Sequence, residues 1–212
     1  MYAFLRKKEF GAKMLDDNRY RLAVTATFSF AINIVYAVYN LILGVADRSW
    51  WFITMSAYYL VLSIMRMYVV FHERKGLADG KRVMRLVGVF LLLLSVVLAG
   101  SVILSATYDV SKSHHEIIMI TIALYTTIKV TLAVMNTVKA QKTNLPFFIT
   151  LRNIGCADAA ASVVSLQRSM FASFGDVTGQ DVFIMNIATG TAAFLIVLIM
   201  GIFMISGKGK RK

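Results

Sequence analysis

Two charged residues lie deep inside apolar stretches of the sequence, where a charge is costly. Lys129 is nine residues before the end of the stretch 117–138, and Asp158 is eleven residues after the start of the stretch 147–171. If both stretches cross a lipid bilayer as helices, a rise of about 1.5 Å per residue places the two charges roughly 13–17 Å from the same surface. Because unpaired ions at that depth are unfavourable, the sequence predicts a buried Lys–Asp pair.

The pair has two interpretations that the residues leave open: it fixes the packing of two helices, or it is a titratable pair that opens when a proton or substrate binds. Asn33 and Asn40 lie seven residues apart in the first apolar stretch, and Asn136 follows Lys129 by seven. Residues seven apart share one face of a helix. The candidate substrate-binding set is therefore Asn33, Asn40, Lys129, Asn136 and Asp158. Hydrogen bonding between helices without transport explains the asparagines equally well.

The composition indicates the kind of molecule that must position these residues. Of 212 residues, 58% are hydrophobic and 16% are charged, and the mean hydropathy is +0.68. Soluble domains carry about 25% charged residues. A soluble enzyme, a disordered chain and, with one Cys, a disulfide scaffold are therefore excluded, and the sequence indicates an all-α, polytopic helical membrane protein.

Six segments are long and apolar enough to be membrane helices, which need about 20 residues each. They are 22–44, 50–71, 86–104, 117–138, 147–171 and 183–205. The stretch 147–171 is the least apolar, and spans only if its neighbours shield its polar residues; an interfacial helix is the alternative. We predict one transmembrane domain over 22–205.

The basic residues predict how this bundle is oriented. With six spans and both ends inside, seventeen Lys and Arg fall in the inner segments and two in the outer loops. The net charge of +12 is thus chiefly an orientation signal. We expect a multi-pass cell-membrane protein whose termini, the basic segment 1–21 and the basic tail 206–212, are cytoplasmic. The expected partners are the bilayer, anionic lipid at the inner face and a second copy of the chain, and not nucleic acid.

An offset of 96 residues reveals an internal repeat. Residues 37–40 align with 133–136 and residues 52–55 with 148–151, without a gap. The same offset places Asn33 on Lys129 and Asn40 on Asn136. Each half, about 22–105 and 116–205, then holds three spans. Because three is odd, the second half is inverted in the membrane, an arrangement typical of secondary transporters, although duplication alone is compatible with an inert bundle.

The remaining polar residues have simpler interpretations. Arg66 and Arg152 lie near the inner ends of their spans, and we expect their long side chains to reach the headgroups as anchors. His114 and His115 are adjacent and diverge on a helix, so they predict no metal site. Cys156 lies among alanines and indicates no thiol chemistry. We therefore expect no enzyme activity, metal or cofactor.

The layout is similar to the membrane domain of cation diffusion facilitators. Gly44, Ser49 and Ala57 resemble that family's first hairpin, and Asp158 followed by Ser162 resembles the end of its second metal-binding helix. The resemblance implies a six-helix fold and divalent-cation antiport. However, that family holds its metal with His or Asp residues four apart on the second and fifth spans. Here the second span has no His, Asp or Glu and Ile154 stands four residues before Asp158, so zinc transport is not predicted.

From the residues we predict a small secondary transporter of unknown substrate, with a polar core around the Lys129–Asp158 pair. The alternative is a non-transporting membrane protein whose polar core is structural and which binds a partner protein or lipid.

Overall fold

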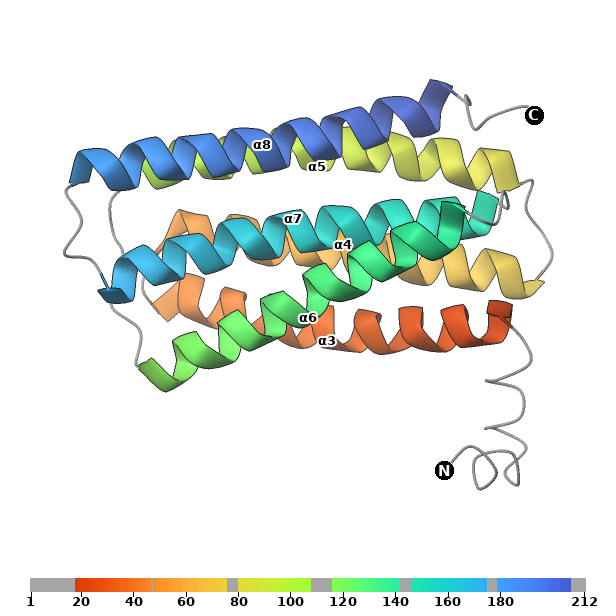
Figure 1. Cartoon of the computed structure of the whole chain (residues 1–212), viewed down its shortest axis with the longest axis horizontal. Helices are drawn as coiled ribbons and strands as arrows, with labels where there is room; N and C mark the ends of the chain where they lie inside the picture. The colour runs from red at the N-terminus through yellow and green to blue at the C-terminus, as the bar shows by residue number, and fades with distance from the viewer. Residues whose placement is uncertain are drawn as a thin grey trace.

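The computed structural model describes six α-helices joined by short connections (Figure 1). The described residues are 18–46, 48–75, 80–107, 116–141, 146–174 and 179–206, and they contain no strand. The helices are α3 (Asn18–Ala46), α4 (Trp50–Lys75), α5 (Gly80–Thr107), α6 (Glu116–Gln141), α7 (Pro146–Phe174) and α8 (Gly179–Ser206). Each predicted span lies within one of them. The predicted basic segment 1–21 and tail 206–212 fall almost wholly outside the described residues.

Five of these helices, α3, α4, α5, α7 and α8, are long and apolar enough to cross a membrane. In α6 the described side chains give a shorter apolar segment, Thr126–Met135. Helices suit such sequences because lipid offers no hydrogen-bond partners, and a helix satisfies its own backbone. The chain is therefore an all-α, polytopic helical membrane bundle, and the weakly apolar segment 147–171 lies in a helix that is long enough to span.

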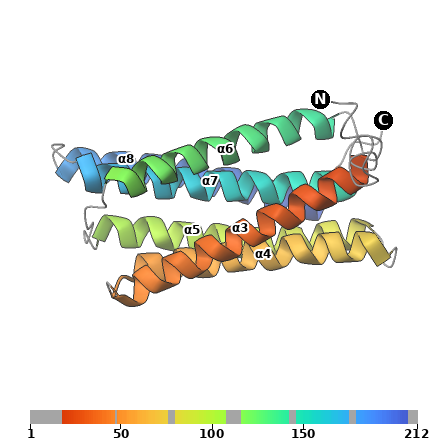
Figure 2. The same ribbon diagram turned by 90° about the horizontal axis from the view of Figure 1, so that it is seen from below.

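Two helices form the centre of the bundle. In both α4 and α7, 56% of the apolar window is buried inside the protein, against 28% in α8 and 22% in α3. Helix α3 packs on α4, α6 packs on α7, and α5 and α8 pack on each other (Figures 1 and 2). The outer helices consequently expose large apolar side chains all along their length, such as Val35 on α3 and Phe203 on α8. This is the surface that lipid covers.

The helix contacts follow an approximate twofold relation between the halves. Exchanging α3 with α6, α4 with α7 and α5 with α8 carries the α3–α4 contact onto α6–α7, and the α4–α5 contact onto α7–α8. The α4–α7 and α5–α8 contacts map onto themselves. Helices α3 and α6 run in opposite directions and cross in Figure 1, as an inverted 3+3 repeat requires. The relation is approximate, since α5 also packs on α7.

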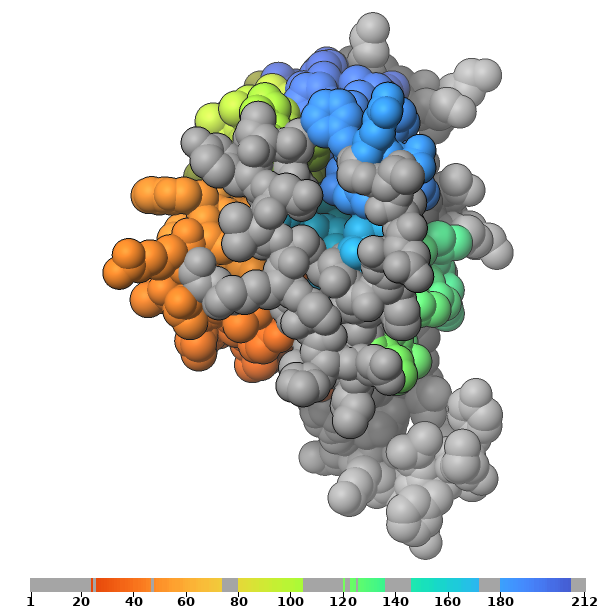
Figure 3. Space-filling view, turned by 90° about the vertical axis from the view of Figure 1, so that its left-hand side faces the viewer, coloured from red at the N-terminus to blue at the C-terminus, as the bar shows by residue number. Residues whose placement is uncertain are grey.

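The end of the bundle at which α3 finishes is closed by a tight turn into α4. The Ser49 amide donates to the Gly44 carbonyl at 3.0 Å, and Arg48 has a left-handed backbone with φ of 50°. A Cβ added to Gly44 would lie 2.7 Å from Ile53 Cγ1, so this close approach requires glycine. In Figure 3 this turn and the start of α8 share one end of the molecule.

Candidate functional site

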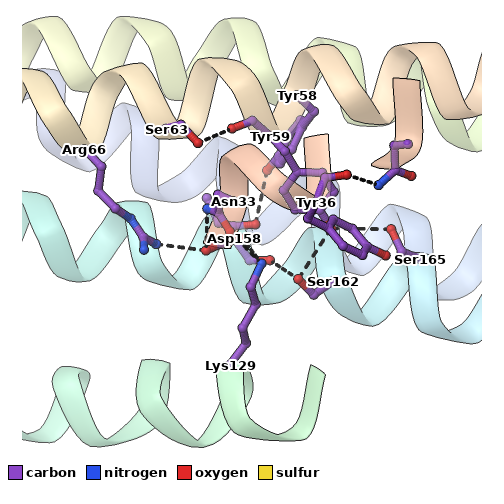
Figure 4. A network of polar contacts seen from close by, with 12 residues as sticks. Asn33, Tyr36, Tyr58, Tyr59, Ser63, Arg66, Lys129, Asp158, Ser162 and Ser165 are labelled. Carbon is purple, nitrogen blue, oxygen red and sulfur yellow. Dashed lines mark hydrogen bonds and ion pairs between the residues drawn. The ribbon is translucent and has the colours of Figure 1, made fainter. Parts of the chain in front are cut away.

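One buried carboxylate joins three other helices near the centre of the bundle (Figure 4). Asp158, on α7, is only 3% exposed. Its Oδ1 accepts a hydrogen bond from Lys129 Nζ of α6 at 2.7 Å. Its Oδ2 accepts one from Arg66 Nη2 of α4 at 2.9 Å and one from Asn33 Nδ2 of α3 at 2.9 Å. The predicted Lys129–Asp158 ion pair is confirmed, as part of a four-residue cluster that we call the charge cluster: Asn33, Arg66, Lys129 and Asp158.

Lys129 is held on several sides. Its Nζ also donates to Asn33 Oδ1 at 2.9 Å. The same Nζ lies 4.9 Å from the ring centroid of Tyr59 and 5.7 Å from that of Tyr36, distances at which an aromatic face attracts a cation. The Tyr59 ring of α4 therefore contributes a cation–π contact to the Lys129 ammonium of α6.

The prediction that Arg66 anchors to headgroups is wrong. Its side chain is buried and forms an ion pair with Asp158. Arg66 lies five residues before the end of the predicted span 50–71, and α4 itself continues through the polar residues 72–75 to Lys75. At that depth a carboxylate within reach stabilises the guanidinium. The repeat offset would have pointed to this position, since it places Arg66 on Ser162, one helical turn after Asp158.

Small residues on α7 allow the other helices to approach the carboxylate. Ala157 and Ala161 are fully buried. The Tyr58 hydroxyl of α4 donates to the Ala157 carbonyl at 3.1 Å, next to Asp158 in the chain. Close backbone approach through alanine, glycine and serine is the common way for helices to associate in lipid. The slim, weakly apolar composition of α7 therefore places it at the centre of the bundle.

Serine hydroxyls line the next two turns of α7. Ser162 Oγ donates to the Asp158 carbonyl at 2.8 Å and lies 3.4 Å from the Tyr59 hydroxyl oxygen. Ser165 Oγ lies 3.5 Å from the same oxygen. A row of buried polar side chains thus continues from the carboxylate along α7, beside Tyr59, toward the end of the bundle at which α7 finishes.

The charge cluster lies where the two halves of the repeat meet. Asn33 and Lys129 occupy equivalent positions 96 residues apart and hydrogen-bond to each other. The position equivalent to Asp158 is Leu62, which is fully buried and apolar. At this pair of equivalent positions, the carboxylate is therefore present in the second half and absent from the first. Asp158 is the one acidic residue of the six helices that does not lie within three residues of a helix end.

One member of the predicted site, Asn40, lies elsewhere. The Asn40 side-chain amide donates to the Tyr36 carbonyl of its own helix at 2.7 Å. It is buried about two turns from Asn33, on the same face of α3. Asn136 lies in α6, but its side chain is outside the described residues. The structure brings together Asn33, Lys129 and Asp158 of the predicted set and adds Arg66.

The charges of the cluster do not cancel. Two cations, Arg66 and Lys129, face one carboxylate. Helices α5 and α8 also pack on α7, but their described charged side chains lie near the helix ends: Lys81, Arg82, Arg85 and Asp181, all exposed. Gly80 lies against Pro146, so the basic start of α5 is roughly 18 Å from Asp158 along α7. The cluster is a buried site with a surplus of one positive charge among the described groups.

The arrangement bears on metal binding. In the described part of the chain, no three His, Cys, Asp or Glu side chains come together to hold a metal ion. Both carboxylate oxygens of Asp158 accept hydrogen bonds from cationic groups. Asp158, the acid of the cluster, thus pairs with Arg66 and Lys129. The resemblance to cation diffusion facilitators would instead make this residue a metal ligand.

No family model, curated protein or solved structure matches this chain. The chain is an integral membrane protein on the basis of its own apolar helices.

Proposed function

We propose that the protein is a small proton-coupled secondary transporter whose substrate site includes the charge cluster. The observation that supports this most is the position of Asp158, a buried carboxylate held by α3, α4 and α6. Inverted repeats of this kind place substrate and coupling-ion sites at the interface of the halves, near the middle of the bilayer. Ionisable residues at that depth are most often functional.

The contacts of Asp158 suggest how proton binding would be coupled to movement. The carboxylate connects α3 and α4 of the first half to α7 of the second through Asn33 and Arg66. Protonation removes the negative charge that holds Arg66 and Lys129, so those contacts weaken. The two halves are then free to rock against each other, which is how inverted-repeat transporters expose a site alternately to the two sides.

Reconstituted protein tests this proposal directly. Proteoliposomes loaded with a pH-sensitive dye are given an inward gradient of one solute at a time: small carboxylates and sulfonates, methylammonium, amino acids and sugars. We expect wild-type protein to move protons with at least one of these classes faster than the passive pH change in liposomes without protein. Asp158→Asn and Lys129→Met, each checked for folding by size-exclusion chromatography, should abolish the movement.

Arg152→Gln is the matched control, because Arg152 is a half-buried arginine of α7 whose Nε donates to Asn153 Oδ1 instead of to the charge cluster. It should retain wild-type proton movement. If the wild-type protein moves no protons with any solute class, the proposed transport function is wrong.

The alternative is a non-transporting membrane protein with a structural polar core that binds a partner protein or lipid. Dense hydrogen bonding favours it: Asp158 is almost fully buried, and other polar bonds between helices, such as Ser56 Oγ to the Ala37 carbonyl at 2.8 Å, serve packing. The double variant Lys129→Met/Asp158→Asn distinguishes the two. A folded double variant with an unchanged cellular phenotype supports the structural role.

A further inference from the structure

We propose that the charge cluster binds a small monovalent anion, a carboxylate or a sulfonate. When Asp158 is protonated, this anion accepts the hydrogen bonds that Arg66, Lys129 and Asn33 otherwise donate to Asp158. This inference rests on the transport function proposed above and names its class of substrate. It starts from the correction at Arg66, since the sequence predicted a Lys–Asp pair and the structure contains a second cation.

The first argument is the geometry of the donors. Lys129 Nζ, Arg66 Nη2 and Asn33 Nδ2 all point to one carboxylate, at 2.7 to 2.9 Å. The three donors come from three different helices, so their convergence is a property of the tertiary structure. An ammonium, a guanidinium and an amide converging in this way make a site for a compact anion, and charge-assisted donors of this kind bind carboxylates strongly. In the present state the Asp158 side chain is the anion that occupies it.

The second argument is the balance of charge. With Asp158 ionised, the two cations and the carboxylate sum to one positive charge. When Asp158 accepts one proton and one monovalent anion binds, the sum is again one positive charge, with Arg66 and Lys129 unchanged. Proton and anion therefore bind together without altering the charge buried in the bilayer, whereas either alone would alter it at considerable cost. The coupled step is electroneutral, one proton with one anion.

A cationic substrate is disfavoured by the same count. It would add to a cluster that already holds two cations, unless it displaced the Lys129 ammonium from Asp158, Asn33 and the rings of Tyr36 and Tyr59. Helices α5 and α8 supply no compensating acid among their described residues near Asp158. Tyr58 and Tyr59 of α4 and Tyr36 of α3 are neutral hydroxyl groups, which leave the count unchanged.

Methanesulfonate is a suitable probe for transport, because it is small, monovalent and ionised throughout the accessible pH range. It therefore does not cross lipid as a neutral acid. An inward methanesulfonate gradient should acidify the lumen of wild-type proteoliposomes, and clamping the membrane potential with potassium and valinomycin should leave the rate unchanged. Arg66→Gln should lower the rate at least about tenfold, since it removes a charged donor, while the control Arg152→Gln should not.

A binding measurement separates this inference from transport. Asp158→Asn mimics the protonated residue, so in lipid nanodiscs it should be stabilised by methanesulfonate with a saturable rise in thermal midpoint that does not depend on pH. Wild-type protein should show the rise only at low pH. Adding Arg66→Gln to Asp158→Asn should raise the apparent Kd about tenfold or more. This double variant keeps the wild-type sum of one positive charge in the cluster, carried by Lys129. Sodium gluconate, a bulky anion, controls for ionic strength.

The outcomes are distinct. Proton movement driven by methylammonium and not by methanesulfonate would overturn the anion assignment while leaving proton-coupled transport intact. Acidification that changes with the clamped potential would overturn the electroneutral coupling. If methanesulfonate does not stabilise Asp158→Asn, the anion-binding site itself is wrong. If methanesulfonate stabilises Asp158→Asn but the wild-type protein moves no protons, the anion site is retained and the transport function is contradicted.

Discussion

At the scale of single residues, the Asp158 carboxylate decides the energetics of the polar core. Burying two cations is tolerable here because each has a charged acceptor at hydrogen-bond distance. Removing that acceptor leaves both largely buried cations without it. The neutral amide of asparagine keeps an oxygen acceptor of similar size in the same place. The two substitutions should therefore differ in cost, although they differ by only a few atoms.

We predict that Asp158→Ala destabilises the folded bundle by about 3–5 kcal/mol, the usual cost of breaking a buried ion pair at one side, and that Asp158→Asn costs clearly less. Thermal unfolding in detergent micelles, followed by circular dichroism, measures both. Arg152→Gln is the control for loss of an arginine outside the charge cluster. Equal midpoints for the alanine and asparagine variants would contradict this account of Asp158.

At the scale of elements, the contact between α5 and α8 depends on glycine. A Cβ added to Gly88 would lie 3.1 Å from the Gly201 carbonyl oxygen and 3.0 Å from Met204 Cβ. A Cβ on Gly201 would lie 3.1 Å from the Gly88 carbonyl oxygen. Because backbone atoms form part of each contact, a rotamer change cannot relieve it. The two helices approach this closely only because both residues lack a side chain.

We predict that Gly88→Leu destabilises the protein by about 1–3 kcal/mol through overpacking. Gly100→Leu is the matched control on the same helix, since a Cβ there meets nothing within 4 Å. Thermal midpoints of the two variants in the same detergent provide the comparison. If Gly100→Leu is as unstable as Gly88→Leu, helix propensity or lipid contact, and not the α5–α8 crossing, controls stability.

At the scale of the whole molecule, an inverted arrangement makes a prediction about sidedness. The turn at Arg48 and the start of α5 lie at opposite ends of the bundle (Figure 1). Basic residues are concentrated near the start of α5 and in the other segments that we predict to be inside. This end of the bundle is therefore predicted to face the cytoplasm. The turn at Arg48 should then face the outside of the cell.

We predict that, in a Cys156→Ser background, Arg48→Cys is labelled on intact cells by a membrane-impermeant maleimide and Lys81→Cys is labelled only after the cells are opened. Both side chains are exposed, so access is set by the membrane and not by burial. Labelling of Lys81→Cys on intact cells would reverse the predicted orientation.

The sequence by itself determined the features that depend on position along the chain. Runs of apolar residues predicted six helices, because lipid imposes both a length and an absence of charge. Counting residues placed Lys129 and Asp158 at matching depth, and their ion pair is confirmed at 2.7 Å. The offset of 96 predicted the equivalence of Asn33 and Lys129, which are in direct contact.

Only the tertiary structure decided which side chains converge. Arg66 and Asp158 are 92 residues apart, and their contact depends on where α4 ends, how it is rotated about its axis and how closely it approaches the slim helix α7. Hydropathy carries no information about that rotation. The same limit explains Asn40, which shares a helix face with Asn33 but bonds to its own backbone. Depth in the membrane is a one-dimensional property that residue counting supplies, whereas the convergence of donors on one carboxylate is a three-dimensional property set by helix packing.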